Sequence, residues 1–230
     1  MSTLLLWLEA PLQSWGADSR FGRRATLPFP TRSGVLGLLC CALGRGGEQQ
    51  EWLAHMRPYT QTVVAYAPEH REASPLLRDY QVVGNGYSSD DTWRDLMIPK
   101  KNNGKPPTNV SGTTITHRFY IQDMAFACAL GLPDGEEETF RAGLSCPVWA
   151  ICLGRKNCVP SEPVFRGIFS TEDEALAEAG RVAAEKNRRE RFRVFDGVRE
   201  QGEVMTLNDV PLCFGIHKRY QDRQVTVLSV

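Results

Sequence analysis

The sequence lacks the features that mark membrane and secreted proteins. Its longest apolar run, Val35 to Leu43, has too few residues to cross a bilayer. The apolar run Thr3–Leu8 is preceded by no Lys or Arg and ends at Glu9, so it does not resemble a secretion signal. We therefore expect a cytoplasmic protein with no membrane partner.

Metal-binding and nucleotide-binding signatures are also missing. The seven Cys form no CxxC pair, and the four His show no metal-ligand spacing. An odd number of Cys without a secretion signal predicts reduced thiols rather than a disulfide framework. No glycine-rich loop ends in Gly-Lys-Ser/Thr, which excludes a Walker A motif. We expect neither a metal nor another cofactor.

Net charge is the third thing the chain lacks, with 27 Lys+Arg against 27 Asp+Glu. A nucleic-acid surface must therefore come from local clustering of cations. Lysine is scarce, since 21 of the basic residues are Arg and 6 are Lys. Arginine suits bidentate phosphate contacts and stacking on bases. With 230 residues and 42% hydrophobic content, the chain is long enough for a sizeable core.

The order of predicted elements indicates an α+β fold. Thr31 or Ser33 caps the first predicted helix and Gly44 ends it, as helix boundaries require. The pattern is β-α-β-β-α-β, that is, RRM-like or ferredoxin-like. Its predicted elements are Thr3–Leu8, Ser33–Leu43, Thr60–Ala67, Met124–Leu132, a short helix ending near Gly143, and Val148–Leu153.

A long polar excursion interrupts this order. Leu76–Gln122 is predicted to be a projecting β-hairpin with an irregular tip, because two β-prone stretches flank a segment rich in Gly, Asn, Ser and Pro. After the core pattern come a helix over Thr171–Lys186 and short strands. We therefore expect an RRM-like domain over residues 1–160, with the excursion at about 76–122, and a small C-terminal helix and β-sheet region over 161–230.

The segment before the first helix carries a local surplus of positive charge. Residues 11–33 hold four Arg and one acidic residue. Helix-start N–H groups with Ser, Thr and Arg donors favour a phosphate, and Trp15 suits stacking on a base. The alternative is a capped helix with a solvated arginine loop and a core tryptophan. The candidate RNA-binding residues here are Gln13, Ser14, Trp15, Arg20, Arg23, Arg24, Thr31, Arg32, Ser33 and Gly34.

Three further clusters combine cations with polar or aromatic side chains. Within the excursion, residues 96–121 carry four Lys and Arg and no Asp or Glu. Cations interleaved with aromatic rings suit single-stranded RNA, whereas a solvated hairpin is the alternative. The other two clusters are the glycine turn 154–157 and the segment 218–223 near the C-terminus. Each is either an RNA contact or an ordinary basic segment exposed to solvent. These candidates are Tyr80, Lys100, Lys101, Lys105, His117, Arg118, Arg155, Lys156, Arg219 and Arg223.

Catalytic patterns are scarce. There is no serine nucleophile elbow and no paired-carboxylate motif, so no catalytic residue is assigned. A metal-free ribonuclease needs one group to deprotonate the 2′-OH and another to protonate the leaving oxygen. His117 with Lys156 or Tyr120 is the weak candidate for this role. We expect a binding protein and keep a metal-independent endoribonuclease as the alternative.

The same residues resemble a known family. The stretches Leu8–Gly16 (LEAPLQSWG), Arg24–Thr26 and Phe29–Leu39 (FPTRSGVLGLL) resemble the N-terminal signature of the CasD family of repeat-associated (RAMP) CRISPR proteins. Leu77–Tyr80 (LRDY) and Leu153–Cys158 (LGRKNC) are similar to later landmarks of its type I-E branch. The resemblance covers about the first 170 residues and is loose beyond them.

This resemblance carries expectations about fold and function. It implies a RAMP domain with a thumb hairpin and one copy in a type I-E Cascade, an antiviral complex. The chain is expected to bind the crRNA at its 5′ handle and to contact the large and backbone subunits. Target DNA is met only indirectly, near the boundary of handle and spacer. In the type I-C branch the relative cuts the guide precursor, whereas in type I-E a separate endoribonuclease does so.

Overall fold

The computed structural model describes residues 2–16, 19–20, 22–70, 76–83 and 114–230. Its helices are α1 (Arg32–Ala42), α2 (Gln50–Met56), α4 (Glu137–Ser145) and α5 (Glu172–Glu185). The main sheet is built from β1 (Thr3–Glu9), β5 (Gln61–Pro68), β8 (Ala125–Gly131), β9 (Phe165–Phe169), β10 (Arg188–Asp196), β11 (Glu203–Cys213) and β12 (Arg219–Ser229). A smaller sheet contains β2 (Leu12–Gln13), β3 (Ser19–Arg20), β4 (Arg23–Arg24), β6 (Leu77–Val83) and β7 (Thr114–Gln122).

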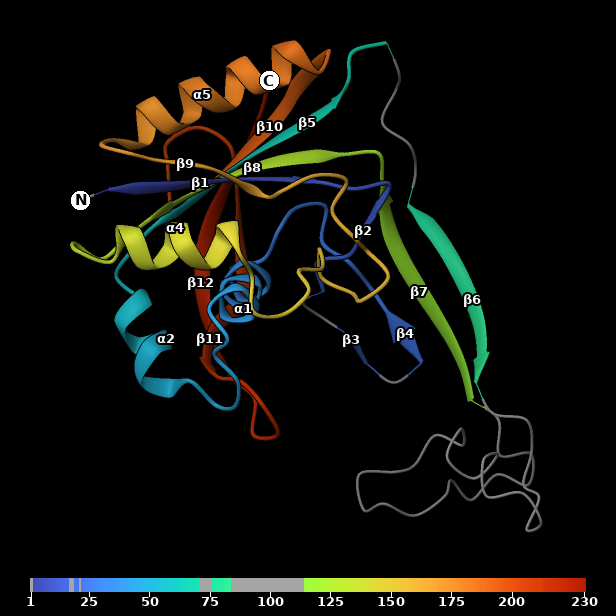
Figure 1. The fold of residues 1–230 in the computed structure, drawn as a ribbon. Coiled ribbons are helices and arrows are strands. Elements are labelled where there is room, and N and C mark those ends of the chain that lie inside the picture. Colours follow the sequence, from blue (N-terminus) through green and yellow to red (C-terminus); the bar gives the residue numbers. More distant parts are fainter. Residues whose placement is uncertain (1, 17–18, 21, 71–75, 84–113) are drawn as a thin grey trace.

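Strand β1 shows why the main sheet is covered on both faces. Leu4, Leu6 and Leu8 belong to the apolar cluster that includes α1 and α4. Leu5 and Trp7 belong to a second cluster, formed with α5. Because side chains alternate between the faces of a strand, this continuous apolar run is that of a strand buried on both sides. Figure 1 shows α5 over one face of the sheet and α1 and α4 over the other.

The core of the fold is the predicted β-α-β-β-α-β motif. Along the chain it consists of β1, α1, β5, β8, α4 and β9. In the sheet its strands lie in the order β9–β1–β8–β5, and each neighbouring pair is antiparallel. This arrangement confirms the α+β class and the ferredoxin-like pattern. Within the described ranges, no helix is long and apolar enough to cross a membrane.

The predicted strand Val148–Leu153 is wrong, because the last strand of the motif is β9. Although Leu153 is fully buried, its N–H donates to the Cys158 carbonyl at 2.7 Å. Its own carbonyl accepts from the N–H of Ser14 at 3.1 Å. These bonds close a local loop on the N-terminal segment, so the apolar residues of this stretch pack without joining the sheet.

Residues beyond 160 do not form a sheet of their own. β9 pairs with β1 and β10 pairs with β5, so the C-terminal strands extend the main sheet on both sides. β12 and β11 follow β10, and β11 contacts both α1 and α2. In the described part of the chain, strands from both sides of the expected boundary at residue 160 therefore belong to one seven-stranded sheet.

Strands β6 and β7 form the predicted projecting hairpin, which extends away from the main sheet (Figure 1). β7 is tied to the body at its C-terminal end, where it pairs with β2, and at His117 and Arg118, where it pairs with β4. The predicted contacts Lys100, Lys101 and Lys105 lie outside the described residues.

Candidate nucleic-acid interface

Two of the predicted N-terminal contacts are interior side chains. Gln13 and Trp15 are 0% and 1% exposed. Gln13 Nε2 donates to the carbonyls of Met124 (2.7 Å) and Leu8 (3.1 Å), and its Oε1 accepts from Trp15 Nε1 (3.2 Å). The indole packs so closely on Gly34 that a Cβ there would lie 2.7 Å from ring carbon Cε3. The buried Gln13 side chain is therefore not the RNA contact that was predicted, and Trp15 is the core tryptophan of the alternative interpretation.

The prediction that Arg32 contacts RNA is also wrong, because its guanidinium is buried and bonded to groups inside the protein. The residue is 3% exposed, and its Nη2 donates to the carbonyls of Met56 (2.9 Å) and Tyr59 (2.5 Å). Nη1 lies 3.3 Å from Asp196 Oδ2. Burial lowers the pKa of the guanidinium, and the nearby Asp196 carboxylate partly offsets this. Arg32 therefore joins α1 to the loop after α2 and to the end of β10.

Arg223, whose side chain is 12% exposed, belongs to the same group of ion pairs. Its Nε and Nη2 donate to the two carboxylate oxygens of Asp209 at 2.7 and 2.8 Å, and its Nη1 donates to Asp196. Burial lowers the pKa of Arg223, but the hydrogen bonds and charges of the two carboxylates outweigh it and raise the pKa overall. Arg32, Asp196, Asp209 and Arg223 are called the arginine–aspartate network below. Arg223 is thus a structural residue, which corrects its assignment to RNA.

The network also occupies the start of α1. Asp209 Oδ2 accepts from the Arg32 N–H at 2.7 Å, and the capping hydroxyl of Thr31 accepts from the Gly34 N–H at 3.1 Å. Two of the N–H groups that attract a phosphate to a helix start therefore already have protein acceptors. Thr31 is 1% exposed, which corrects it as an RNA contact. Ser33 and Gly34 stay partly exposed beside a cavity of about 150 Å³.

Strand β4 carries two exposed arginines to the hairpin. It pairs in parallel with β7, so that Arg23 lies opposite His117 and Arg24 opposite Arg118. The Arg23 guanidinium carbon lies 4.9 Å from the centroid of the Phe119 ring, within the range of a cation–π contact. Among the N-terminal arginines whose side chains are described, Arg23 and Arg24 are the ones that the fold leaves at the surface with the hairpin.

One face of the hairpin joins these cations to aromatic rings. Tyr80 is 56% exposed and lies opposite His117, with ring centroids 5.4 Å apart. Arg78 lies opposite Phe119 on the same face, because directly paired residues share a face. Arg23, Arg78, Tyr80, His117 and Phe119 are called the hairpin face below. Sequence reasoning missed Arg78, whose alternation with Tyr80 on one strand was the available signal.

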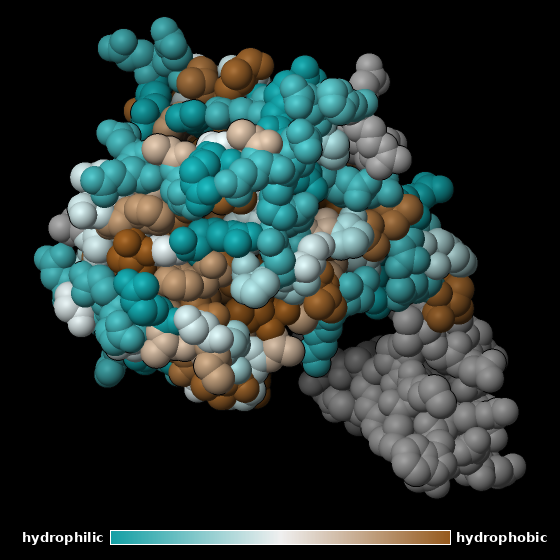
Figure 2. Space-filling view, turned by 45° about the horizontal axis from the view of Figure 1, so that its top comes forward, coloured by the Kyte–Doolittle hydropathy of each residue, from teal (hydrophilic) through white to brown (hydrophobic). Residues whose placement is uncertain are grey.

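The hairpin face continues into apolar surface toward the tip. Val82 and Ile115, paired with each other, are 51% and 50% exposed. Figure 2 shows apolar surface on the projecting part of the molecule, beside the grey residues. On the opposite face of β7, Arg118 lies between Arg24 and Asp79 in the strand register.

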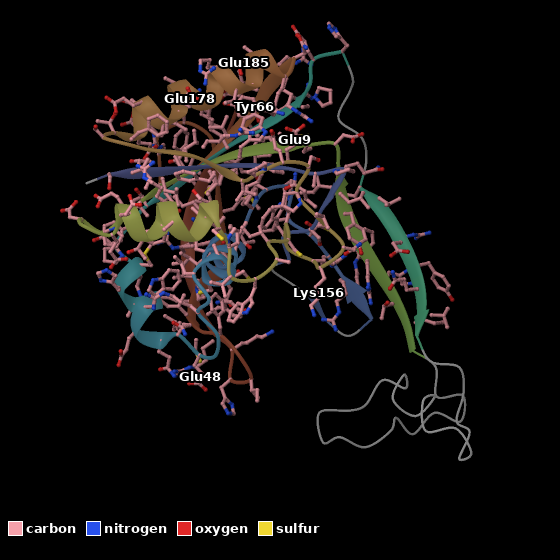
Figure 3. The ribbon with its side chains drawn as sticks, viewed as in Figure 1. Glu9, Glu48, Tyr66, Lys156, Glu178 and Glu185 are labelled. Carbon is pink, nitrogen blue, oxygen red and sulfur yellow. The ribbon has the colours of Figure 1, made fainter. Side chains whose placement is uncertain are left out.

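The turn after Leu153 lies against the base of the hairpin. Arg155 donates to the carbonyls of Phe119 (3.2 Å) and Arg24 (2.8 Å), and Lys156 is exposed beside β4 (Figure 3). Ser14 is 3% exposed, and its hydroxyl donates to the same Phe119 carbonyl at 3.2 Å. This burial corrects Ser14 as an RNA contact.

Two predicted cations remain, Arg219 and Arg20. Arg219 is exposed at the start of β12, where its Nη2 is 3.5 Å from the Gln50 side-chain oxygen. Arg20 lies in β3, and its side chain is outside the described part.

The structure separates His117 from one of its two predicted proton-transfer partners. Tyr120 does not face His117, because a three-residue separation along β7 puts the two side chains on opposite faces. Tyr120 is 1% exposed and its hydroxyl accepts from Asn157 Nδ2 at 3.2 Å, which corrects it as a proton-transfer partner. Among the described residues, no three His, Cys, Asp or Glu side chains are grouped to hold a metal ion.

Comparison with known proteins decides the family. The family model described as CRISPR-associated protein (Cas_Cas5) matches residues 3–226. The chain belongs to the Cas5 family. Over 180 residues it is 31% identical to the CRISPR system Cascade subunit CasD of Escherichia coli (strain K12), covering 75% of this chain and 73% of that protein.

Solved structures agree with this membership. A chain of a CRISPR RNA-guided surveillance complex is similar with 29% identity and a TM-score of 0.73, covering 99% of the Cas5 chain described here and 90% of that chain. A crystal structure of a Cas protein shares the fold with 23% identity and a TM-score of 0.57, covering 99% and 94%.

Proposed function

We propose that this Cas5-family chain is a non-catalytic, cytoplasmic RNA-binding subunit of a type I-E Cascade that holds the 5′ handle of the crRNA. The observation that carries the proposal is the hairpin face, where Arg23 and Arg78 accompany three aromatic rings on an element outside the core. Membership of the Cas5 family and similarity to a Cascade CasD subunit support it.

The chemistry of the hairpin face matches single-stranded RNA. An unpaired nucleotide offers an exposed base and a phosphate, which an aromatic ring and an arginine bind together. Tyr80 has more than half of its surface free for stacking, and Arg23 and Arg78 are exposed on either side of the β7 backbone. Arg24 and Lys156 add exposed charge along the same edge of the molecule.

The proposal extends to the partners that family membership suggests. The large subunit and the nearest backbone subunit are the proposed protein partners, with target DNA met only indirectly near the handle–spacer boundary. The hairpin is the proposed contact with RNA at that boundary, since it projects from the body of the protein (Figure 1).

Purified protein should bind labelled handle RNA in EDTA without cutting it. Tyr80→Ala should weaken binding about tenfold, because stacking on an aromatic ring is worth about 1–3 kcal/mol per base. Arg78→Ala should weaken binding and lower the salt slope of log K by about 0.7, the loss expected for one phosphate contact on a single strand. Filter binding at several salt concentrations measures both.

Arg181→Ala is the matched control, because Arg181 is an exposed arginine on α5 that pairs with Glu178 and Glu185. Figure 3 shows these two glutamates on α5, across the main sheet from Lys156. The control should bind like the wild type. Equal binding by all variants would show that the hairpin face does not hold the handle.

The metal-independent endoribonuclease, acting on CRISPR repeat RNA, remains the second candidate, because the buried Nδ1 of His117 has no hydrogen-bond partner among the described residues and the Tyr80 ring is adjacent. A discrete cut in EDTA that disappears in His117→Ala would establish that activity in place of simple binding. Intact RNA after incubation with the wild type and with His117→Ala would support the binding role.

A further inference from the structure

Arg155 joins the two strands that carry the basic residues of the interface. Its Nη1 donates to the Phe119 carbonyl on β7 at 3.2 Å, and its Nη2 donates to the Arg24 carbonyl on β4 at 2.8 Å. Its guanidinium carbon lies 4.6 Å from the centroid of the buried Tyr120 ring. A planar guanidinium with several fixed N–H donors is suited to serve two carbonyls at once.

The loop that carries Arg155 is anchored on both sides of it. Gly154 has a φ of +93°, and a Cβ on it would lie 1.7 Å from the Ser14 carbonyl oxygen. On the other side, Asn157 Nδ2 donates to the Tyr120 hydroxyl at 3.2 Å. Two backbones in such close approach leave the loop little freedom, so the guanidinium extends from a fixed base.

The strand that Arg155 holds is short. β4 has two residues and pairs with β7 through Arg23↔His117 and Arg24↔Arg118. The neighbouring carbonyl of Gly22 accepts from the His117 N–H at 2.7 Å. A two-residue pairing is weak by itself, because stable strand pairs are normally longer. The bond from Arg155 to the Arg24 carbonyl therefore adds an attachment where few backbone bonds are made.

We propose that Arg155 is a positioning residue and not a direct RNA contact. It fixes β4 against β7, so that the side chains of Arg23 and Arg24 stand beside the hairpin when RNA binds. This inference rests on the proposed RNA-binding function and refines the sequence prediction, which assigned Arg155 to RNA directly.

A double-mutant cycle on handle-RNA affinity tests the inference. Arg155→Ala and Arg155→Lys are measured in the wild type and in an Arg23→Ala/Arg24→Ala background, each over several salt concentrations. Lys keeps the charge but does not reproduce the fork, so both variants should weaken binding about tenfold in the wild type. Each should lower the salt slope by about 1.4, the value for two phosphate contacts at about 0.7 each. In the Arg23→Ala/Arg24→Ala background neither should weaken binding further.

The other outcomes separate the alternatives. Equal losses from Arg155→Ala in both backgrounds, a slope change of about 0.7 and rescue by Lys would make Arg155 a direct phosphate contact. No loss in either background would remove it from the interface. If Tyr80→Ala weakens binding but Arg23→Ala/Arg24→Ala does not, the positioning role fails while RNA binding stands. If none of these variants matters, the proposed function itself fails. Arg181→Ala, on α5, is the control that should bind like the wild type, and thermal unfolding of each variant confirms that it is folded.

Discussion

Arg223→Ala should destabilise the protein by about 3–5 kcal/mol, the usual cost of removing one partner from a buried ion pair. Arg223 donates to both oxygens of Asp209, which is 1% exposed, and to Asp196. Without the guanidinium, the Asp209 carboxylate keeps the Arg32 N–H as a partner but stays charged in the interior. Urea unfolding followed by circular dichroism measures the free energy of unfolding.

Arg219→Ala is the control for this experiment. It removes an arginine from the same strand, but this side chain is exposed and the change should stay within about 0.5 kcal/mol. The double variant Arg223→Ala/Asp209→Ala should cost clearly less than the sum of the two single changes, because the partners act together. A loss below about 1 kcal/mol for Arg223→Ala would mean that water replaces the guanidinium and that the network does not hold α1 to the C-terminal strands.

Gly154→Ala should cost about 2–4 kcal/mol and weaken handle-RNA binding at the same time. The positive φ is unfavourable for alanine by about 1–3 kcal/mol, and the methyl group collides with the Ser14 carbonyl. Relieving the collision separates the two backbones and lengthens the bond from the Ser14 N–H to the Leu153 carbonyl, worth about 1 kcal/mol. The same movement displaces Arg155. Unfolding and filter binding are measured on the same preparation.

Gly180→Ala is the control for this experiment, because the same chemical change should here raise the stability slightly instead of lowering it. Gly180 is exposed in α5 and a Cβ there meets nothing within 4 Å. Alanine is better than glycine in a helix by about 0.5–1 kcal/mol, so this variant should be slightly more stable and bind RNA normally. Gly154→Ala with the stability of the wild type would show that the loop shifts freely and does not anchor the hairpin.

The regular elements were readable from local patterns. The largely apolar run Thr3–Leu8 predicted a buried strand, and the structure places β1 there, buried on both faces. Thr31 or Ser33 before an apolar helical stretch predicted the start of α1, and the structure selects Thr31, whose hydroxyl accepts from the Gly34 N–H. The projecting hairpin followed from two β-prone stretches around a polar tip. In each case the signal lies within a few consecutive residues.

The roles of the polar residues were not readable in the same way. Arg32 and Arg24 look alike in the sequence, yet Arg32 meets Asp196, 164 positions away, and is buried, whereas Arg24 is exposed on β4. The strand Val148–Leu153 was predicted from apolar residues that pack in a loop, because β9 occupies the sheet position beside β1.

The sequence by itself determined the family, the α+β motif and the presence of a thumb-like hairpin, since each depends on residue type and short-range order. Only the tertiary structure decided which arginines face solvent, because a guanidinium is buried or exposed according to the carboxylates and carbonyls that distant strands bring to it. Asp209 and Asp196 bind Arg32 and Arg223 in this way. Arg23 and Arg78 stay exposed at the hairpin.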